Sequence, residues 1–174
     1  LNACTNMEWR CDGDCTVACS GEGACTGIGA HATQAASLAF SCTGSGQNCA
    51  VSAEVHCPLS ADVGDDTGLC SVDCAGTGHY TCKGIDVDAA DALNTAVSVT
   101  CRSPGQQTCE NMAVDCSNGG TCTVACSGEN GANRPCFHAN VRGPNALTLK
   151  ATCAQGSEYC GNYASVVCPE TCAS

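Results

Sequence analysis

Apolar and small polar residues alternate along short segments that end in cysteine. In the run Cys15-Thr-Val-Ala-Cys19-Ser-Gly, cysteine and valine fall on one side of an extended chain, and threonine and alanine fall on the other. This period of two is typical of a strand that buries one face. The same alternation, with Val, Phe40 or Leu149 as the apolar residue, precedes further cysteines. The strands so predicted end at Cys19, Cys42, Cys74, Cys101, Cys126 and Cys153.

The distances between these strand ends indicate how the strands are connected. They are 23, 32, 27, 25 and 27 residues, and the longest contains an extra loop from Pro58 to Leu69. A repeat of about 25 residues fits one coil of a right-handed parallel β-helix. Two further inward columns are expected: Trp9, Val55, Val114 and Val166, and also Ile28, Ile85 and Ala139 followed by Val141. We therefore predict an all-β fold, a disulfide-rich right-handed parallel β-helix (β-solenoid).

A longer repeat groups the cysteines into units. The Cys-x-Val-x-Cys run recurs at Cys70 and at Cys122, 55 and 52 residues after the preceding copy. Three units of six cysteines and a remnant with three account for the total of 21. The units span residues 4–48, 49–108 and 109–159, with a partial unit at 160–174. We predict that residues 1–174 form a single solenoid domain.

Composition assigns the cysteines to disulfides. There are 21 cysteines in 174 residues and only 3% aromatic residues, so cross-links must supply stability that large apolar side chains usually provide. Thiolate metal sites favour Cys-x-x-Cys, Cys-x-Cys or Cys-Cys pairs, and the sequence has none of these. The protein is therefore expected in an oxidising compartment: secreted, at the cell surface or in the lumen of an organelle.

Strand geometry restricts which cysteines can pair. Residues four apart in a strand are separated by about 13 Å, beyond the Cα distance of about 7 Å that a disulfide tolerates. This excludes a bond between Cys15 and Cys19. Pairing each remaining cysteine with its neighbour across a loop predicts ten disulfides: Cys11/Cys15, Cys19/Cys25, Cys42/Cys49, Cys57/Cys70, Cys74/Cys82, Cys101/Cys109, Cys116/Cys122, Cys126/Cys136, Cys153/Cys160 and Cys168/Cys172.

Cys4 is left unpaired by this scheme. It would pair with a coil that precedes the sequence. Three interpretations stay open, namely a free thiol, an intermolecular link, and a chain cut from a longer array. A frayed, reduced terminus is the structural alternative.

A glycine and cysteine spacing provides a resemblance. Val-x-Cys-x-Gly followed within a few residues by Cys, at Val17 to Cys25 and at Val72 to Cys82, resembles cysteine-rich repeat proteins of unicellular algae and other protists. That resemblance covers nearly the whole chain and implies a β-helical fold. It carries no catalytic residue across.

Residues that could carry chemistry are few. Asp86, Asp88 and Asp91 could bind calcium or act as acid and base, but a solvated acidic face is the simpler interpretation. Asp62, Asp65 and Asp66 lie in the extra loop with Gly64 and Gly68, which we interpret as a mobile loop. The four histidines, His31, His56, His79 and His138, occupy different positions of the repeat, so we expect no pair to be brought together. We predict no catalytic residue, metal or cofactor, and no enzymatic activity.

Charge excludes other classes of partner. The net charge is −11, and the six Lys and Arg residues are scattered along the sequence. We therefore expect no basic surface that could bind nucleic acid or an anionic sugar. No apolar run is long enough to span a membrane.

The outward positions of the predicted strands form the most informative surface. They carry small residues and should make a flat binding face, with these members: Thr16, Ala18, Ser20, Ser41, Thr43, Ser71, Ser98, Thr100, Thr123, Ala125, Ser127 and Thr152. We predict a non-catalytic structural or interaction module, an accessory subunit of a larger assembly in the thylakoid lumen or at the cell surface, with a protein partner. One alternative is an ice-binding protein that uses this flat face. A second is a calcium- or polysaccharide-binding module.

Overall fold

The structure, a computed structural model, describes residues 4–45, 47–59, 68–103, 107–116, 118, 120–128, 135–153 and 165–167. Within these ranges the chain forms strands and no helix. The strands are β1 (Glu8–Cys19), β2 (Gly29–Cys42), β3 (Glu54–His56), β4 (Leu69–Cys74), β5 (Asp86–Asp88), β6 (Ala96–Ser103), β7 (Ala113–Asp115), β8 (Thr121–Gly128), β9 (Asn140–Arg142), β10 (Thr148–Cys153) and β11 (Ser165–Val167).

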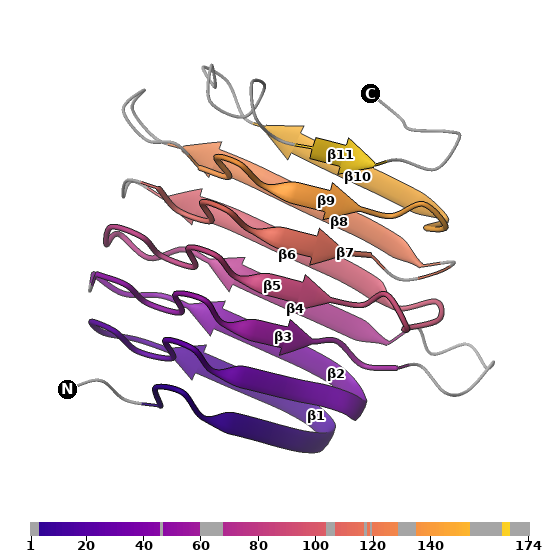
Figure 1. The fold of residues 1–174 in the computed structure, drawn as a ribbon. Helices are drawn as coiled ribbons and strands as arrows, with labels where there is room; N and C mark the ends of the chain where they lie inside the picture. The colour runs from indigo at the N-terminus through magenta and orange to yellow at the C-terminus, as the bar shows by residue number, and fades with distance from the viewer. Residues whose placement is uncertain are drawn as a thin grey trace.

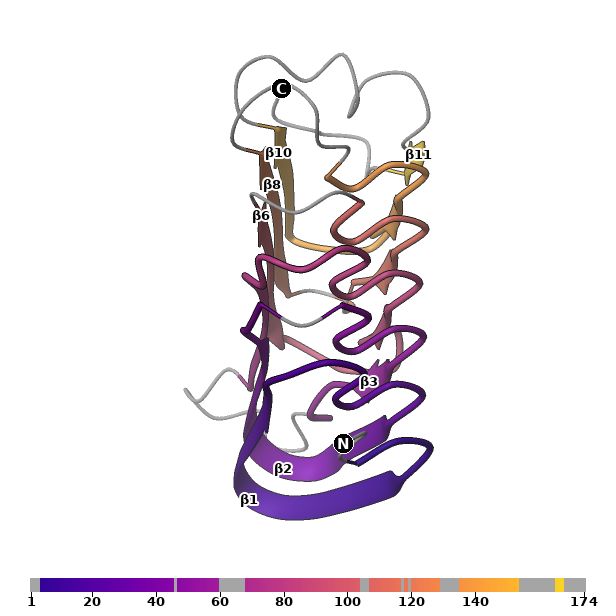
Figure 2. The ribbon, with the colours of Figure 1, turned by 90° about the vertical axis from the view of Figure 1, so that its left-hand side faces the viewer.

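All of these strands pair in parallel and belong to one curled sheet. One row runs β2-β4-β6-β8-β10, and the other runs β2-β3-β5-β7-β9-β11, with β1 beside β2. The chain alternates between the rows, so that successive segments lie one above the other (Figure 1). Strands β1 and β2 are long enough to bend from one row into the other. The result is two facing walls joined at a curved corner (Figure 2).

The cysteines at the strand ends set the register of the first row. Cys19 pairs with Cys42, Cys42 with Cys74, and the column continues through Cys101 and Cys126 to Cys153. These are the six cysteines at which the alternation predicts strand ends. Four of them end their strands as predicted, whereas β6 and β8 continue for two residues beyond Cys101 and Cys126. Four residues earlier, cysteines alternate with aliphatic residues in a second column: Cys15, Leu38, Cys70, Val97, Cys122 and Leu149. One six-cysteine unit therefore corresponds to two neighbouring strands of the row.

Small residues fill the space between the two walls. Phe40 is the largest of the fully buried side chains and lies between Val17 and Val72 in its column. In the other row, one inward column contains Trp9, Ala30, Val55, Val87, Val114 and Val141, and Val166 is the register partner of Val141. The column expected from sequence lacked Ala30 and Val87 and set Val141 apart from it. Val141 in fact lies between Val114 and Val166.

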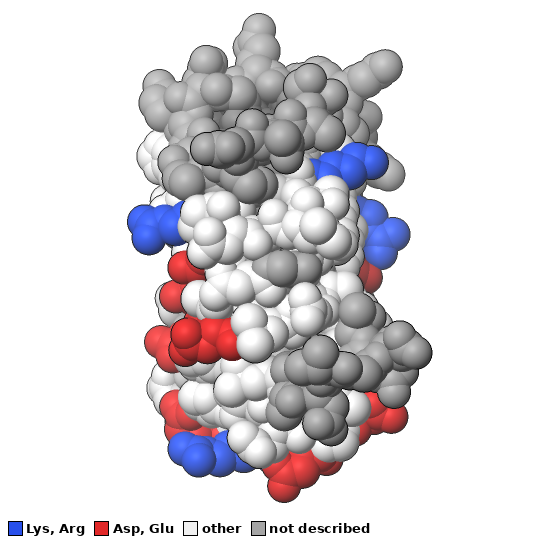
Figure 3. Space-filling view, turned by 90° about the vertical axis from the view of Figure 1, so that its right-hand side faces the viewer, with Lys and Arg blue, Asp and Glu red and all other residues white. Residues whose placement is uncertain are grey.

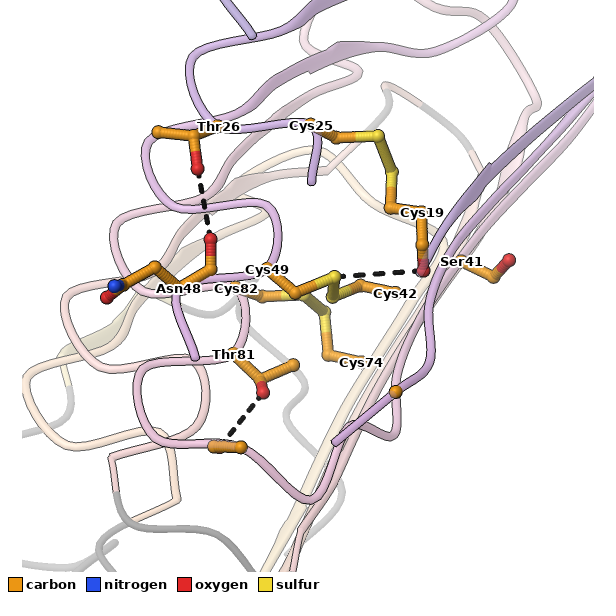
Figure 4. Close-up of a disulfide and its surroundings, with 12 residues drawn as sticks. Cys19, Cys25, Thr26, Ser41, Cys42, Asn48, Cys49, Cys74, Thr81 and Cys82 are labelled. Carbon is orange, nitrogen blue, oxygen red and sulfur yellow. Dashed lines mark hydrogen bonds between the residues drawn. A yellow bond between two sulfur atoms is a disulfide. The ribbon is translucent and has the colours of Figure 1, made fainter. Parts of the chain in front are cut away.

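Among the described residues there are eight disulfides. Seven connect a strand to the loop that follows or precedes it, and Cys11–Cys15 lies within β1, where the register with β2 shifts around Gly13. The eight bonds are Cys11–Cys15, Cys19–Cys25, Cys42–Cys49, Cys57–Cys70, Cys74–Cys82, Cys101–Cys109, Cys116–Cys122 and Cys126–Cys136, and all eight are predicted pairs, although Cys11 and Cys15 are joined within β1 and not across a loop. The predicted bonds Cys153/Cys160 and Cys168/Cys172 each involve at least one cysteine outside the described residues, namely Cys160, Cys168 and Cys172. Cys4 is free and exposed. Five of the bonds stack one above another where the row of β1, β2, β4, β6 and β8 leads into the following loops. Three of these five are drawn in Figure 4.

The loops that receive these disulfides are joined by backbone hydrogen bonds. Cys82 N donates to Cys49 O, Cys109 N to Thr81 O, and Cys136 N to Thr108 O, at 2.8, 2.9 and 2.9 Å. The three donor cysteines, Cys82, Cys109 and Cys136, have a positive φ of 52° to 56°. A non-glycine residue in this region costs of order 1 kcal/mol or more, so the surrounding structure must hold it there. The disulfide and the hydrogen bond together provide that constraint.

Candidate functional site

Two surfaces of the described structure gather functional groups, and the first is the flat face predicted from sequence. Its members lie on the outer side of β1, β2, β4, β6, β8 and β10 or directly after these strands, and all are exposed or half-buried. From Asp14 to Cys19 in β1, and throughout the pairs that follow, the register is continuous. One column holds Thr16, Ala39, Ser71, Ser98, Thr123 and Lys150, and the next holds Ala18, Ser41, Asp73, Thr100, Ala125 and Thr152.

One ion pair crosses this face. Arg102 Nη2 lies 2.9 Å from Asp73 Oδ2, and the side chains are 61% and 34% exposed. The pair joins neighbouring strands β4 and β6. It therefore interrupts the array of small residues near its centre.

The second surface is on the opposite row, and sequence reasoning did not assemble it. Two outward columns follow from the register: Glu8, Gly29, Glu54 and Asp86 in one, and Arg10, His31, His56, Asp88, Asp115 and Arg142 in the other. We call Glu8, His31, Glu54, His56, Asp86, Asp88 and Asp115 the His–carboxylate cluster. In Figure 3, acidic atoms gather along the left-hand edge, on the side where this row lies, with basic atoms above and below them.

Histidine and carboxylate groups face one another in this cluster. His31 Nε2 contacts Glu8 Oε2. His56 Nδ1 lies 3.4 Å from Asp88 Oδ2, and His56 Nε2 lies 4.0 Å from Glu54 Oε2. The rings of His31 and His56 are stacked, with centroids 4.4 Å apart and planes at 10°.

The expectation that stacking brings no two histidines together is therefore wrong. His31 and His56 are directly opposite each other in the register of β2 and β3. The sequence-based column omitted Ala30, because an alanine gives little apolar signal, and without it His31 has no assigned position. If Trp9, Ala30 and Val55 are aligned as one column, His31 and His56 each follow a member of that column and therefore lie side by side in the next one. His79 and His138 are exposed and lie outside the cluster.

The cluster also contains two of the three aspartates predicted as candidates. Asp86 and Asp88 line an open cavity of about 370 Å3 together with Glu54, His56 and Asp115, and Asp91 does not line it. Burial raises the pKa of Asp86, and the neighbouring charges of Asp88 and Glu54 raise it further. The site thus holds more negative charge than its surroundings neutralise, which favours a cation. Asp62, Asp65, Asp66 and Gly64 lie outside the described residues.

A buried ion pair in the loops has a structural role. Glu110 is buried, and its Oε2 lies 2.9 Å from Lys83 Nζ on the neighbouring loop. Lys83 also lies 4.6 Å above the ring of Tyr80. Such a pair compensates a charge that would be costly to bury alone.

Groups of three sulfur atoms also come close together, at Cys74, Cys101 and Cys109 and at Cys101, Cys126 and Cys136. Each group is one disulfide with a sulfur of the neighbouring disulfide above or below it. A metal binds the thiolate form of cysteine, and every sulfur in these two groups is already part of a disulfide. They are therefore part of the stacked disulfides.

The eight disulfides indicate an oxidising, non-cytosolic environment. In the part of the chain that the structure describes, no helix has the length and apolar character needed to cross a membrane. The chain matches no family model, no curated protein and no solved structure.

Proposed function

We propose that the protein is a non-catalytic interaction module that docks onto a protein partner through its flat face. In this proposal the protein is a right-handed parallel β-helix with about 25 residues per coil. It is an accessory subunit of a larger assembly in the thylakoid lumen or at the cell surface. The observation that supports it most is the continuous register of small residues on the outer side of six strands.

Flatness follows from this register. Neighbouring strands are about 4.8 Å apart, so six strands give a face roughly 24 Å long. Side chains such as Ser71, Ser98 and Thr123 project little from the sheet and have few rotamers to lose when they are covered. A rigid face with hydroxyl groups at regular intervals can therefore be buried against another surface at a small entropic cost.

The ion pair at the centre supports a protein partner. Arg102 and Asp73 present one positive and one negative group at fixed positions near the centre of a face that otherwise consists mainly of small, uncharged residues. A complementary protein surface can match such a pattern and gain specificity from it.

The test is a photo-crosslinker at the centre of the face. We would place a photoreactive amino acid at Thr100 and, as a matched control, at Asn111, which is exposed on the disulfide-receiving loops. In an extract of the native source, Thr100 should give one adduct of defined mass and Asn111 should not. Equal adducts from both positions, or none from Thr100 in a folded protein, would contradict the proposal.

Ice binding is a second candidate, because the hydroxyl groups of Ser98, Thr100 and Thr123 recur at strand spacing. The Arg102–Asp73 pair and Lys150 lie on the same face and break the uniform hydroxyl array that ice binding favours. Thermal hysteresis of the purified protein separates the candidates. Its absence at millimolar concentration would remove ice binding and leave the docking proposal unaffected.

A further inference from the structure

At the end of the His–carboxylate cluster nearest the N-terminus, on β1 to β3, the side chains have the composition of a transition-metal site. Glu8, His31, Glu54 and His56 come from three neighbouring strands and meet around Gly29. Gly29 stands between Glu8 and Glu54 in their column and has no side chain to fill the space. A Cβ atom added there would come within 2.6 Å of Glu8 Oε2, so the carboxylate of Glu8 occupies this gap.

The nitrogen atoms of the two histidines face the carboxylates. His31 Nε2 contacts Glu8, and His56 Nε2 is 4.0 Å from Glu54 Oε2. Two ligand atoms on one tetrahedral zinc ion are about 3.3 Å apart, given bonds of about 2.0 Å. These two separations lie on either side of this value, but each is within one His–Glu pair. No three of the four ligand atoms lie within 4.8 Å of one another, so the side chains must move toward a common point to enclose one ion.

The stacked rings must separate for both to bind one ion, since the ion has to lie near the plane of each ring. The side chains allow this movement. Those of Glu8 and Glu54 are 69% and 67% exposed, and those of His31 and His56 are 25% and 29% exposed. Rotamer changes are fast for exposed side chains such as Glu8 and Glu54, whereas the two half-buried rings must also give up their stacking contact.

Asp88 is placed to orient His56. Its Oδ2 lies 3.4 Å from Nδ1, which is the ring nitrogen that faces away from Glu54. Histidines that bind metals commonly give the other ring N–H to a carboxylate, which fixes the tautomer. With Asp88 on Nδ1, Nε2 of His56 is left as the ligand.

We propose that Glu8, His31, Glu54 and His56 bind a divalent transition-metal ion, with Zn2+ as the best chemical match. Two imidazole and two carboxylate groups suit zinc, copper or nickel, whereas calcium takes oxygen ligands. The excess of carboxylates around the site adds attraction for any cation. The site is separate from the flat face, so it does not depend on the docking proposal.

The test is calorimetric titration of the full oxidised chain with ZnCl2 after chelator treatment, with Cys4 alkylated so that its thiol cannot bind. We expect one Zn2+ per chain and weaker or no heat with Ca2+. His31→Ala and His56→Ala should each weaken binding about tenfold or more. The His79→Ala/His138→Ala double variant is the matched control and should bind as the parent does.

Two further variants separate ligands from bystanders. Asp88→Asn should weaken binding by about tenfold through His56, and Gly29→Ala should weaken it by displacing the carboxylate of Glu8. Long-range 15N spectra report the site directly, because the Nε2 signals of His31 and His56 should shift with zinc and those of His79 should not. The variants' circular dichroism shows whether they are folded.

Three results would overturn the proposal. They are the absence of a one-to-one zinc complex, equal losses in the His79/His138 control, and unchanged affinity in folded His31→Ala and His56→Ala variants. In the last case the carboxylates alone would attract the ion.

Discussion

Removal of one buried disulfide should destabilise the protein by an amount that its loop length sets. Cys101 and Cys109 are fully buried, and their bond closes a sequence separation of 8 residues. Loop-closure entropy gives about 2.5 kcal/mol for a loop of this size at 25 °C. Cys101 Sγ also lies 3.9 Å from Met112 Sδ, so the sulfur contributes packing as well. We expect Cys101→Ala/Cys109→Ala to lose at least this amount.

Other bonds provide an internal scale for the same effect. Cys11–Cys15 has a separation of 4 and Cys57–Cys70 a separation of 13. The corresponding entropy terms are about 2 and about 3 kcal/mol. The free energy lost on double alanine substitution should therefore rise from the first pair to the second.

The assay is urea unfolding of the oxidised variants, followed by far-UV circular dichroism without reductant. All variants would carry Cys4→Ser, so that no free thiol can exchange with the disulfides. Intact mass after alkylation confirms that the remaining bonds have formed. A loss below about 1 kcal/mol for the Cys101–Cys109 pair, in a protein with its other bonds intact, would refute the view that these disulfides hold the turns.

Four other substitutions test packing and charge. Phe40→Ala should cost about 3–5 kcal/mol because Phe40 is 1% exposed, and Phe137→Ala, at a half-buried position, should cost less in the same urea titration. Asp86→Asn should raise the urea midpoint at neutral pH with chelator present, because burial and Asp88 raise the pKa of Asp86 and so disfavour its charged form in the folded state. That gain should vanish near pH 3, below the ordinary Asp pKa, where both states are protonated; a gain that persists there would have another cause. Arg102→Ala should cost less than about 1 kcal/mol, since the ion pair with Asp73 is exposed, and a larger loss would show that the pair holds β4 and β6 together.

The strands and disulfides could be predicted because their signals are local. Cys-x-Val-x-Cys identifies the inward face of a strand, and the extended geometry of this run excludes a bond between its two cysteines. The register follows, because a cysteine occupies the same aligned position in each strand of the row. The flat face comes from the same alternation.

The cluster and the loops could not be predicted for physical reasons. His31 and His56 meet through a register that depends on Ala30, which carries almost no pattern of its own. In the loops, Ala50 and Cys82 have positive φ although neither is a glycine. Their conformation is imposed by hydrogen bonds between neighbouring loops and by disulfides, so it is a property of the assembled stack.

The most direct measurement is a peptide map of the protein under non-reducing conditions, with free thiols alkylated before digestion. The account predicts the eight bonds of the structure, from Cys11–Cys15 to Cys126–Cys136, and alkylation at Cys4. A peptide with Cys15 joined to Cys19, or alkylation at most of the cysteines, would contradict it.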